Sequence, residues 1–213
     1  LTDVYNQYVT DVVKEVIDQA GPEVMEAATL DGRLMGIPFT GVAKESVPLV
    51  WIRDDWMQKL NLQPPKTMDD LLRIAHAFTT QDPDGNGRHD TFGLGLDKDL
   101  GLAVGFFNGF HAYRGIWIED GQGGLMYSSI QPEMRNALQK LQELYKAGII
   151  DPEFGVKDTA KVYESIGSNK LGMIYGGISA ALIEAQTPDV LWKPYPIPSI
   201  DDKPALNQHG LNV

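Results

Sequence analysis

Strand-like and helix-like segments alternate along the whole chain, and this alternation limits the fold more than any other feature of the sequence. The run Val47–Ile52 is apolar on successive residues and rich in β-branched side chains, as in a strand covered on both faces. A second strand of this kind is expected at Leu171–Tyr175, and amphipathic helices lie between the two. Strands that alternate with helices are typical of an α/β architecture, so we expect a mostly parallel or mixed sheet.

Two of the expected helices have clear start and stop signals. One follows Thr67 as its N-cap and has acidic residues in its first turn. The other begins at Pro132 and stops at Gly148. The side chains expected to face the core are Leu71, Leu72, Ile74, Ala75 and Phe78 in the first helix and Met134, Ala137, Leu138, Leu141, Leu144 and Tyr145 in the second.

The remaining elements are expected from weaker signals. They are a helix at 4–20 with Val4, Tyr8, Val12, Val16 and Ile17 at helical spacing, a short helix at 23–28, a turn at Asp31-Gly32, a helical segment at 54–60, a weak helix at 100–107, a hairpin through Asp120-Gly121, helices at 158–166 and 179–185, and an extended segment at 191–200.

Composition excludes several classes of protein. The 213 residues include no cysteine, which excludes disulfide scaffolds, thiol catalysis and zinc sites built on cysteine. The 29 acidic residues outnumber the 18 basic ones, and the resulting net charge of −11 disfavours nucleic acid as a partner. The longest nearly apolar stretch, Leu100–Phe107, is too short to span a membrane. The chain begins without Met and stops where a strand is expected to start, so we expect it to be a piece of a longer protein.

The segment Asp82–Asp90 has the ligand spacing of a calcium loop. Its oxygen donors would be the side chains of Asp82, Asp84, Asn86 and Asp90 and the carbonyl of Arg88. A glycine occupies the loop position that needs a sharp turn, whereas Gly93 stands where an EF-hand has its bidentate Glu. We therefore expect a structural Ca²⁺ without a helix–loop–helix sensor. The alternative is a turn-rich surface loop, because Asp-Pro-Asp-Gly forms turns without a metal.

The serine in Gly177-Ile178-Ser179-Ala180 suggests a second hypothesis for the function, a serine hydrolase. It follows an expected strand and precedes an expected helix, as in a nucleophile elbow, and Asp189 or Asp201 with His209 would complete a hydrolase triad. The closing glycine of that motif is missing, and the strand–helix units that precede a hydrolase nucleophile are absent. The preferred interpretation is that the backbone N–H groups at Gly177 and Ser179 face a ligand in a cleft.

Aromatic and polar residues gather in the segment 106–117, where they suit a polar, ring-shaped ligand such as a sugar. The alternative for each aromatic side chain is ordinary core packing. The four histidines are too far apart in the sequence to predict a transition-metal site. The expected ligand-binding residues are Asn108, Phe110, His111, Tyr113, Trp117, Tyr175, Gly177 and Ser179.

Several segments together resemble family 1 extracellular solute-binding proteins, the capture subunits of bacterial sugar importers. They are Asp31–Pro38, Trp51–Trp56, Leu60–Leu62, Pro65–Leu71, the acidic loop at 82–90, Gln131–Met134, Leu144–Phe154 and Lys170–Met173. The subgroup most similar to this chain is the large lipoproteins that bind oligosaccharides, which include alginate-binding proteins with a calcium loop. Thr91 stands where that subgroup often has an acidic residue, and Ser179 stands where maltose-type relatives have a stacking Trp.

The resemblance implies a type II periplasmic-binding-protein fold, in which two α/β lobes close on a ligand like a Venus flytrap. Residues 1–38 would be the closing helices of the first lobe and the crossover, and residues 39–213 the second lobe with a calcium loop at 82–91. It also implies that the segment 108–113 lies at the cleft and that the partners are a carbohydrate and the membrane permease subunits of an ABC importer. The protein would be monomeric, either lipid-anchored on the extracellular face of the membrane or periplasmic.

The function expected from these observations is capture of an extracellular sugar or oligosaccharide, without catalysis. Two alternatives from other classes remain: a serine hydrolase with Ser179 as nucleophile, and a calcium-dependent structural module. A hydrolase would lose ester turnover on substitution of Ser179, whereas a structural module would have no ligand cleft.

Overall fold

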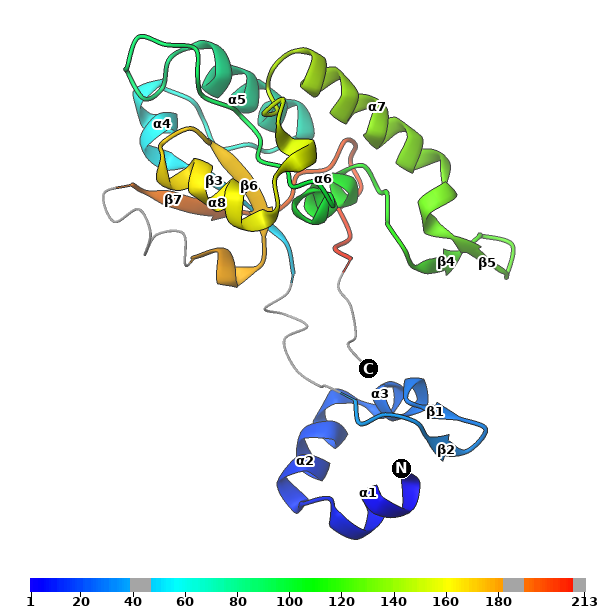
Figure 1. Cartoon of the computed structure of the whole chain (residues 1–213). Helices are drawn as coiled ribbons and strands as arrows, with labels where there is room; N and C mark the ends of the chain where they lie inside the picture. Colours follow the sequence, from blue (N-terminus) through cyan, green and yellow to red (C-terminus); the bar gives the residue numbers. More distant parts are fainter. Residues whose placement is uncertain (39–46, 182–189, 209–213) are drawn as a thin grey trace. The chain divides into compact units, whose positions relative to one another are not determined.

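The computed structural model describes residues 1–38, 47–181 and 190–208 (Figure 1). It divides into two compact units, which we call the N-terminal unit, Leu1–Ser46 with His209–Val213, and the main unit, Val47–Gln208. Within the described ranges, no helix is both long and apolar enough to cross a lipid bilayer.

The N-terminal unit contains helices and one short hairpin. Its elements are α1 (Thr2–Tyr8), α2 (Asp11–Ala20), α3 (Pro22–Ala27), β1 (Thr29–Leu30) and β2 (Arg33–Leu34). The single helix expected at 4–20 is wrong, because the backbone is extended at Val9 and α2 starts afresh at Thr10. The Thr10 hydroxyl accepts a hydrogen bond from the Val13 N–H, so this residue caps a new helix. The turn expected at Asp31-Gly32 is confirmed, since it joins β1 to β2 in antiparallel register.

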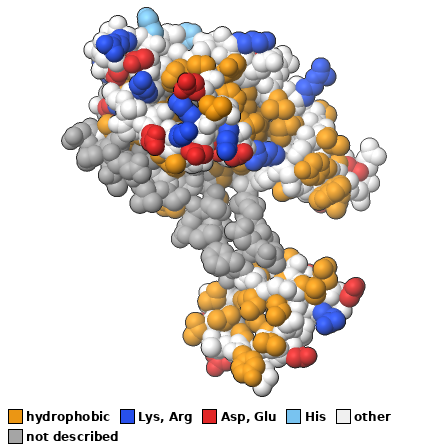
Figure 2. All heavy atoms as spheres, viewed as in Figure 1, with side chains coloured by type: hydrophobic (Ala, Val, Ile, Leu, Met, Phe, Trp, Pro, Cys, Tyr) orange, Lys and Arg blue, Asp and Glu red, His pale blue; other side chains and the backbone are white. Residues whose placement is uncertain are grey.

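The apolar face expected along residues 4–17 is only partly buried. Ile17 is enclosed, but four other apolar side chains of this face are exposed to solvent: Val4, Tyr8, Val12 and Val16. Figure 2 shows apolar side chains gathered on the surface of this unit. The pattern therefore marks a surface that the described part of the N-terminal unit does not itself cover.

The main unit is built on a three-stranded sheet. Its central strand β3 (Leu49–Arg53) lies between β6 (Met173–Gly176) and β7 (Trp192–Tyr195), and both pairings are antiparallel. The sequence predicts a mostly parallel or mixed sheet; the mostly parallel form is wrong, because the named strands pair in antiparallel register. Among the described residues, parallel pairing is present only as isolated bridges of the segment 92–94 with Leu171 and Ile150. The expectation that β3 is covered on both faces is confirmed, because all of its residues except Leu49 are buried.

Helices cover the sheet on both faces. The elements are α4 (Asp54–Lys59), α5 (Met68–Thr80), η1 (Gly101–Ala103), α6 (Val104–Gly109), β4 (Trp117–Glu119), β5 (Leu125–Tyr127), η2 (Ser128–Ile130), α7 (Pro132–Lys146), η3 (Phe154–Val156), α8 (Thr159–Gly167) and η4 (Ile178–Ala181). One core cluster joins β3 to α5, α6 and α7, and a second lies between the sheet and α8. The helix expected at 179–185 is a 3₁₀ turn as far as Ala181, and residues 182–189 lie outside the described residues.

The start of α5 and the inner face of α7 show where the sequence patterns hold and where they fail. Thr67 and Asp70 form a capping box, in which the Thr67 hydroxyl accepts the Asp70 N–H and the Asp70 carboxylate accepts the Thr67 N–H. In α7 the expected core residues include Leu138 and Tyr145, which are 45% and 43% exposed. The buried stripe of α7 is therefore narrower than its apolar pattern indicates.

A buried arginine explains the segment Trp51–Trp56. Arg53 is 2% exposed, and its guanidinium donates to both carboxylate oxygens of Asp55 at 2.8 and 2.6 Å. It also donates to the Asn169 side chain at 2.7 Å and lies 4.3 Å from the ring centroid of Trp56. The planar fork of an arginine suits this enclosed position, so the motif serves packing around the end of β3.

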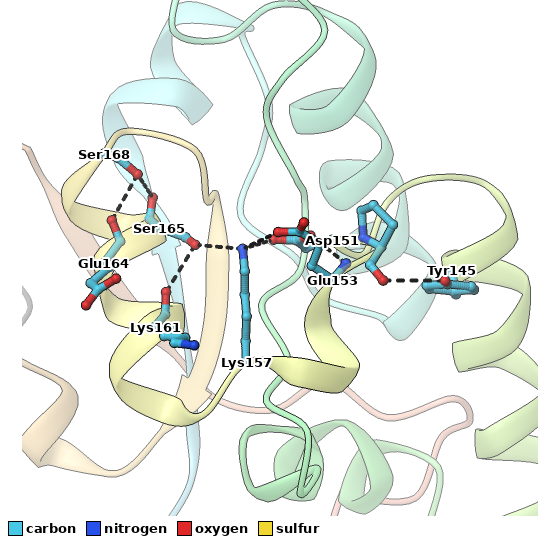
Figure 3. A network of polar contacts seen from close by, with 9 residues as sticks. Tyr145, Asp151, Glu153, Lys157, Lys161, Glu164, Ser165 and Ser168 are labelled. Atoms are coloured by element: carbon cyan, nitrogen blue, oxygen red, sulfur yellow. Dashed lines mark hydrogen bonds and ion pairs between the residues drawn. The ribbon is translucent and has the colours of Figure 1, made fainter.

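A polar network ties the chain after α7 to α8 (Figure 3). The Lys157 ammonium contacts the Asp151 carboxylate and lies 3.4 Å from the Ser165 hydroxyl, while Asp151 also accepts the Glu153 N–H at 2.8 Å. Because Lys157 and Asp151 are largely buried, the network fixes the turn that brings α8 onto the sheet.

Candidate functional site

The candidate site is built from the corner at the end of α6 and from a late segment of the main unit. We call residues 108–114 the α6 corner and residues 199–208 the C-terminal strap. His111 has the left-handed backbone conformation, with φ 55°, and its Nε2 lies 2.9 Å from Asp201 Oδ1 and 3.2 Å from Ser199 Oγ. The hydrogen bond with His111, and then one from the Lys203 N–H, lowers the pKa of Asp201. The imidazole thus joins the corner to the strap.

Gln131, at the start of α7, braces the same corner from the other side. Its side-chain oxygen accepts the Tyr113 N–H at 3.1 Å, and its amide nitrogen donates to the His111 carbonyl at 2.8 Å. This bracing role was not predicted, because a glutamine before a helix carries no signal for a partner 20 residues earlier. Only the folded chain shows that the corner is held rigidly at both ends.

Gln208 closes the strap onto the corner. Its side chain pairs with the backbone of Arg114, accepting the N–H at 2.9 Å and donating to the carbonyl at 2.7 Å. In the amide orientation that satisfies its neighbours, Asn108 donates to the Val104 carbonyl and accepts the Gln208 N–H at 2.9 Å. Asn108 is fully buried, and its two hydrogen bonds connect α6 to the strap.

Three of the residues expected to bind ligand lie in the interior of the main unit. Asn108, Phe110 and Tyr175 are 0%, 7% and 1% exposed. Phe110 packs against the Phe106 ring with centroids 4.9 Å apart. Burial raises the pKa of Tyr175, and its hydroxyl has no hydrogen-bond partner among the described residues. As the structure stands, these three side chains offer almost no surface to a ligand.

The other expected residues have accessible surface. Trp117 is 66% exposed on the hairpin of β4 and β5, where it pairs with Tyr127 across the strands. The two rings have centroids 5.8 Å apart and are tilted by 59°. Tyr127 was missed, although the hairpin expected through Asp120-Gly121 is confirmed and places the two rings opposite each other. Apolar side chains gather around this hairpin in Figure 2.

His111 and Tyr113 are partly exposed at the corner, and partial burial raises the pKa of Tyr113. Gly177 is half-buried after β6, and Ser179 lies in η4, but its side chain is outside the described residues. A groove of about 650 Å³ runs beside the strap, with Leu49, Lys66, Thr67, Ser199, Asp201 and Lys203 among its lining residues. Positively charged, negatively charged and hydroxyl side chains therefore border the strap.

A serine, a histidine and an aspartate meet at this corner, but not as a catalytic triad. A triad needs the serine and the aspartate on opposite ring nitrogens of the histidine. One nitrogen then accepts the serine proton, while the N–H of the other nitrogen is held by the aspartate. Here Ser199 and Asp201 both contact Nε2 of His111. The expected triad partners Asp189 and His209 lie outside the described residues. The three side chains at the corner therefore form a positioning cluster.

The acidic loop at 82–90 is held by its own side chains. Asp82 accepts the N–H groups of Gly85, Asn86 and Gly87 at 3.0–3.1 Å. The Asn86 amide nitrogen donates to Asp84 at 2.7 Å and to Asp90 at 3.0 Å. These contacts draw the expected metal ligands to one side of the loop.

The electrostatics of the loop suit a bound cation, although its present geometry does not enclose one. Partial burial, and then the neighbouring carboxylates, raise the pKa of Asp84. Among the described residues, no three His, Cys, Asp or Glu side chains are grouped so as to hold a metal ion. Asn86 turns its N–H₂ group toward the carboxylates and its oxygen toward the Arg88 N–H. The donor chemistry fits Ca²⁺ provided that the Asn86 amide turns over.

The chain is similar in sequence to known binding proteins. It is 32% identical over 158 residues, 72% of this chain and 30% of the relative, to the polygalacturonan/rhamnogalacturonan-binding protein YtcQ of Bacillus subtilis. It is 28% identical over 71% of its length to FusA of Streptococcus pneumoniae, named as a fructooligosaccharide ABC transporter substrate-binding protein, of which it covers 30%. The chain is homologous to substrate-binding proteins of sugar ABC transporters. No family model matches the sequence.

Solved structures show the same fold. An EF-hand mutant of FusA in complex with fructo-nystose matches with a TM-score of 0.72 at 19% identity, over 99% of this chain and 45% of that one. Alginate-binding protein AlgQ2 without calcium ion matches with a TM-score of 0.71 at 21% identity, over 93% of this chain and 42% of that one. The chain spans about a third of the length of the curated relatives that it matches. It therefore has the fold of part of a solute-binding protein.

Proposed function

We propose that the protein containing this chain captures an extracellular sugar or oligosaccharide in a cleft between two lobes and delivers it to an ABC importer, without catalysis. The observation that carries this proposal is the identity of 32% over 72% of the chain with a polysaccharide-binding protein. The exposed ring pair on the β4–β5 hairpin and the polar groove beside the strap supply the two kinds of contact that sugars use.

Within the main unit, the accessible residues make the contacts and the buried ones support them. Trp117 and Tyr127 offer apolar ring faces, and His111 and Tyr113 offer polar groups at a braced corner. The backbone N–H groups near Gly177 and Ser179 remain candidate donors to the ligand. Asn108, Phe110 and Tyr175 hold α6 and β6 in place from within.

Substitution on the hairpin tests the ligand contacts. Trp117→Ala in the full-length protein should weaken binding of the best oligosaccharide about tenfold, a loss of about 1.4 kcal/mol. Leu125→Ala is the matched control, because Leu125 is 67% exposed on the same hairpin but has no ring. It should leave the affinity measured by calorimetry unchanged. Equal affinities of the two variants would remove Trp117 from the site.

We propose a two-lobed organisation for the whole protein, based on the same similarity. Residues 1–38 would be the closing helices of the first lobe, and residues 39–213 the second lobe. The exposed apolar side chains of α1 and α2 support this division, because a monomeric solute-binding protein would cover them with the rest of its first lobe. The partners are a carbohydrate and membrane permease subunits, and the location is the extracellular face, by a lipid anchor, or the periplasm.

We also propose a structural Ca²⁺ in the acidic loop, held by Asp82, Asp84, Asn86, Asp90 and the Arg88 carbonyl. Support comes from the raised pKa of Asp84 and from two proteins of the same fold, AlgQ2 solved without calcium ion and an EF-hand mutant of FusA. A cation that binds only the folded state, at a hundred times its Kd, stabilises by about 2.7 kcal/mol. The melting temperature should therefore fall when a chelator is added to the native chain.

The same addition should leave Asp84→Ala unaffected, because the variant lacks a central ligand. An unchanged melting temperature of the native chain, after metal carry-over has been excluded, would contradict the calcium site. Mg²⁺ should restore stability poorly, since it prefers an octahedron with several waters.

A further inference from the structure

Two asparagines in the chain are followed by glycine, in the pairs Asn86-Gly87 and Asn108-Gly109. An Asn-Gly pair deamidates more readily than other Asn pairs, because glycine has no side chain to hinder its backbone nitrogen. In this reaction the glycine nitrogen bonds to the asparagine side-chain carbonyl carbon and ammonia leaves. Water then opens the succinimide ring to aspartate or isoaspartate.

The first pair is accessible to solvent and base. Asn86 and Gly87 are both exposed, and neither belongs to a helix or a strand. Gly87 has φ +75°, and a Cβ added there would meet no atom within 4 Å, so the space around the pair is open. The surroundings of this asparagine therefore place no steric block on ring closure.

Hydrogen bonds nevertheless hold each reacting group of this pair. The Gly87 N–H donates to Asp82 Oδ2 at 3.0 Å, which occupies the nucleophile. The Asn86 amide nitrogen donates to Asp84 and Asp90, and its oxygen accepts the Arg88 N–H at 2.7 Å. Ring closure must break the contact to Asp82 and turn the amide away from its partners, so the loop has to open first.

The second pair is enclosed. Asn108 is fully buried near the end of α6. A Cβ at Gly109 would come within 2.2 Å of Met68 and 2.7 Å of the Pro198 carbonyl, which shows how closely other segments surround the pair. Ring closure at Asn108 therefore requires the main unit to unfold around it.

We propose that Asn86 is a latent deamidation site controlled by the Asp82 contact, whereas Asn108 is protected by the whole fold. Deamidation at Asn86 would replace the amide group that bridges Asp84 and Asp90 with another carboxylate. The product would add a negative charge to a loop that already has three carboxylates. This chemistry does not depend on the proposed sugar-binding function.

Peptide mapping by mass spectrometry tests the proposal. The native chain is incubated at mildly alkaline pH, with chelator present, and deamidation is followed at both asparagines. We expect Asn86 to react at least about tenfold faster than Asn108. A tenfold ratio corresponds to a difference of about 1.4 kcal/mol in the free energy of opening. In a denaturing concentration of urea both rates should rise and become similar. Equal rates in the native chain, or no rise at Asn86 in urea, would overturn the proposal.

A pair of variants isolates the restraining contact. Asp82→Ala frees the Gly87 N–H and should speed deamidation at Asn86 several-fold without changing the rate at Asn108. Asp120→Ala is the matched control, because Asp120 also accepts backbone N–H groups in a glycine-rich turn but lies in the β4–β5 hairpin. Equal rates at Asn86 in the two variants would show that Asp82 does not control the site.

Discussion

At the residue scale, Arg53 shows why an ion pair has to be judged by its surroundings. Its guanidinium is enclosed between Asp55, Asn169 and the Trp56 ring, whereas Arg73 makes a similar pair with Asp70 in solvent. Loss of a buried partner leaves charge and hydrogen-bonding groups uncompensated, while loss of an exposed partner changes little.

We therefore expect Arg53→Met to lower the free energy of unfolding by about 3 kcal/mol. Arg73→Met, the control with a side chain 76% exposed, should cost less than about 1 kcal/mol. Urea unfolding followed by tryptophan fluorescence compares the two. A similar midpoint for both variants would contradict the structural role of the Trp51–Trp56 motif.

Asp70 links one residue to the pH dependence of stability. Hydrogen bonds from the Thr67 side chain, and then from the Lys66 and Thr67 N–H groups, lower its pKa from 3.8 to about 2. Because the folded chain favours the charged form, this stabilisation is present above about pH 4 and is lost as the pH falls through about 2. The stability difference between the native chain and Asp70→Ala should be constant near neutral pH and narrow below pH 4. A difference that widened in acid would contradict the capping box.

At the element scale, local signals predicted the helices better than the sheet. The N-cap Thr67 and the first-turn proline Pro132 predicted the starts of α5 and α7, because both signals depend on neighbours in the sequence. The break at Thr10 uses the same chemistry and was missed because the apolar spacing continues through it. Strand direction could not be predicted, since β6 and β7 reach β3 from more than a hundred residues away and their order depends on the whole fold.

The segment after the acidic loop explains why the EF-hand pattern fails at its last position. A Cβ at Gly93 would lie 2.1 Å from the Ala75 carbonyl of α5, so no side chain fits there. The Gly93 N–H donates to the Ile149 carbonyl and the Thr79 hydroxyl, both at 3.0 Å. The loop is thus followed by an extended segment packed on α5, where a second EF-hand helix would need space.

This packing gives a prediction for two glycines. Gly93→Ala should lower the free energy of unfolding by about 2–3 kcal/mol, because the backbone of α5 has to move. Gly167→Ala is the control, since a Cβ there meets no atom within 4 Å at the end of α8, and it should change stability by at most about 1 kcal/mol in the stabilising direction. Chemical denaturation measures both, and equal stabilities would show that the segment is not held against α5.

At the scale of the whole molecule, the candidate site could be predicted only in part. The sequence pointed to the α6 corner, and Trp117 proved to be exposed near a second ring. It could not show that Asn108, Phe110 and Tyr175 are interior, because aromatic and polar residues in a loop-rich stretch or at the end of a strand are found in cores and clefts alike. The strap residues that hold the corner, such as Asp201 and Gln208, lie about 90 positions away and join it only in the folded chain.

The central claim is that the whole protein binds a carbohydrate and leaves it unchanged. Calorimetric titration of the full-length protein with a panel of plant and bacterial oligosaccharides, each recovered afterwards and checked by mass spectrometry, tests both halves of it. We expect saturable binding of at least one oligosaccharide, which is recovered intact. Failure to bind any member of the panel, or recovery of a cleaved or modified sugar, would contradict it.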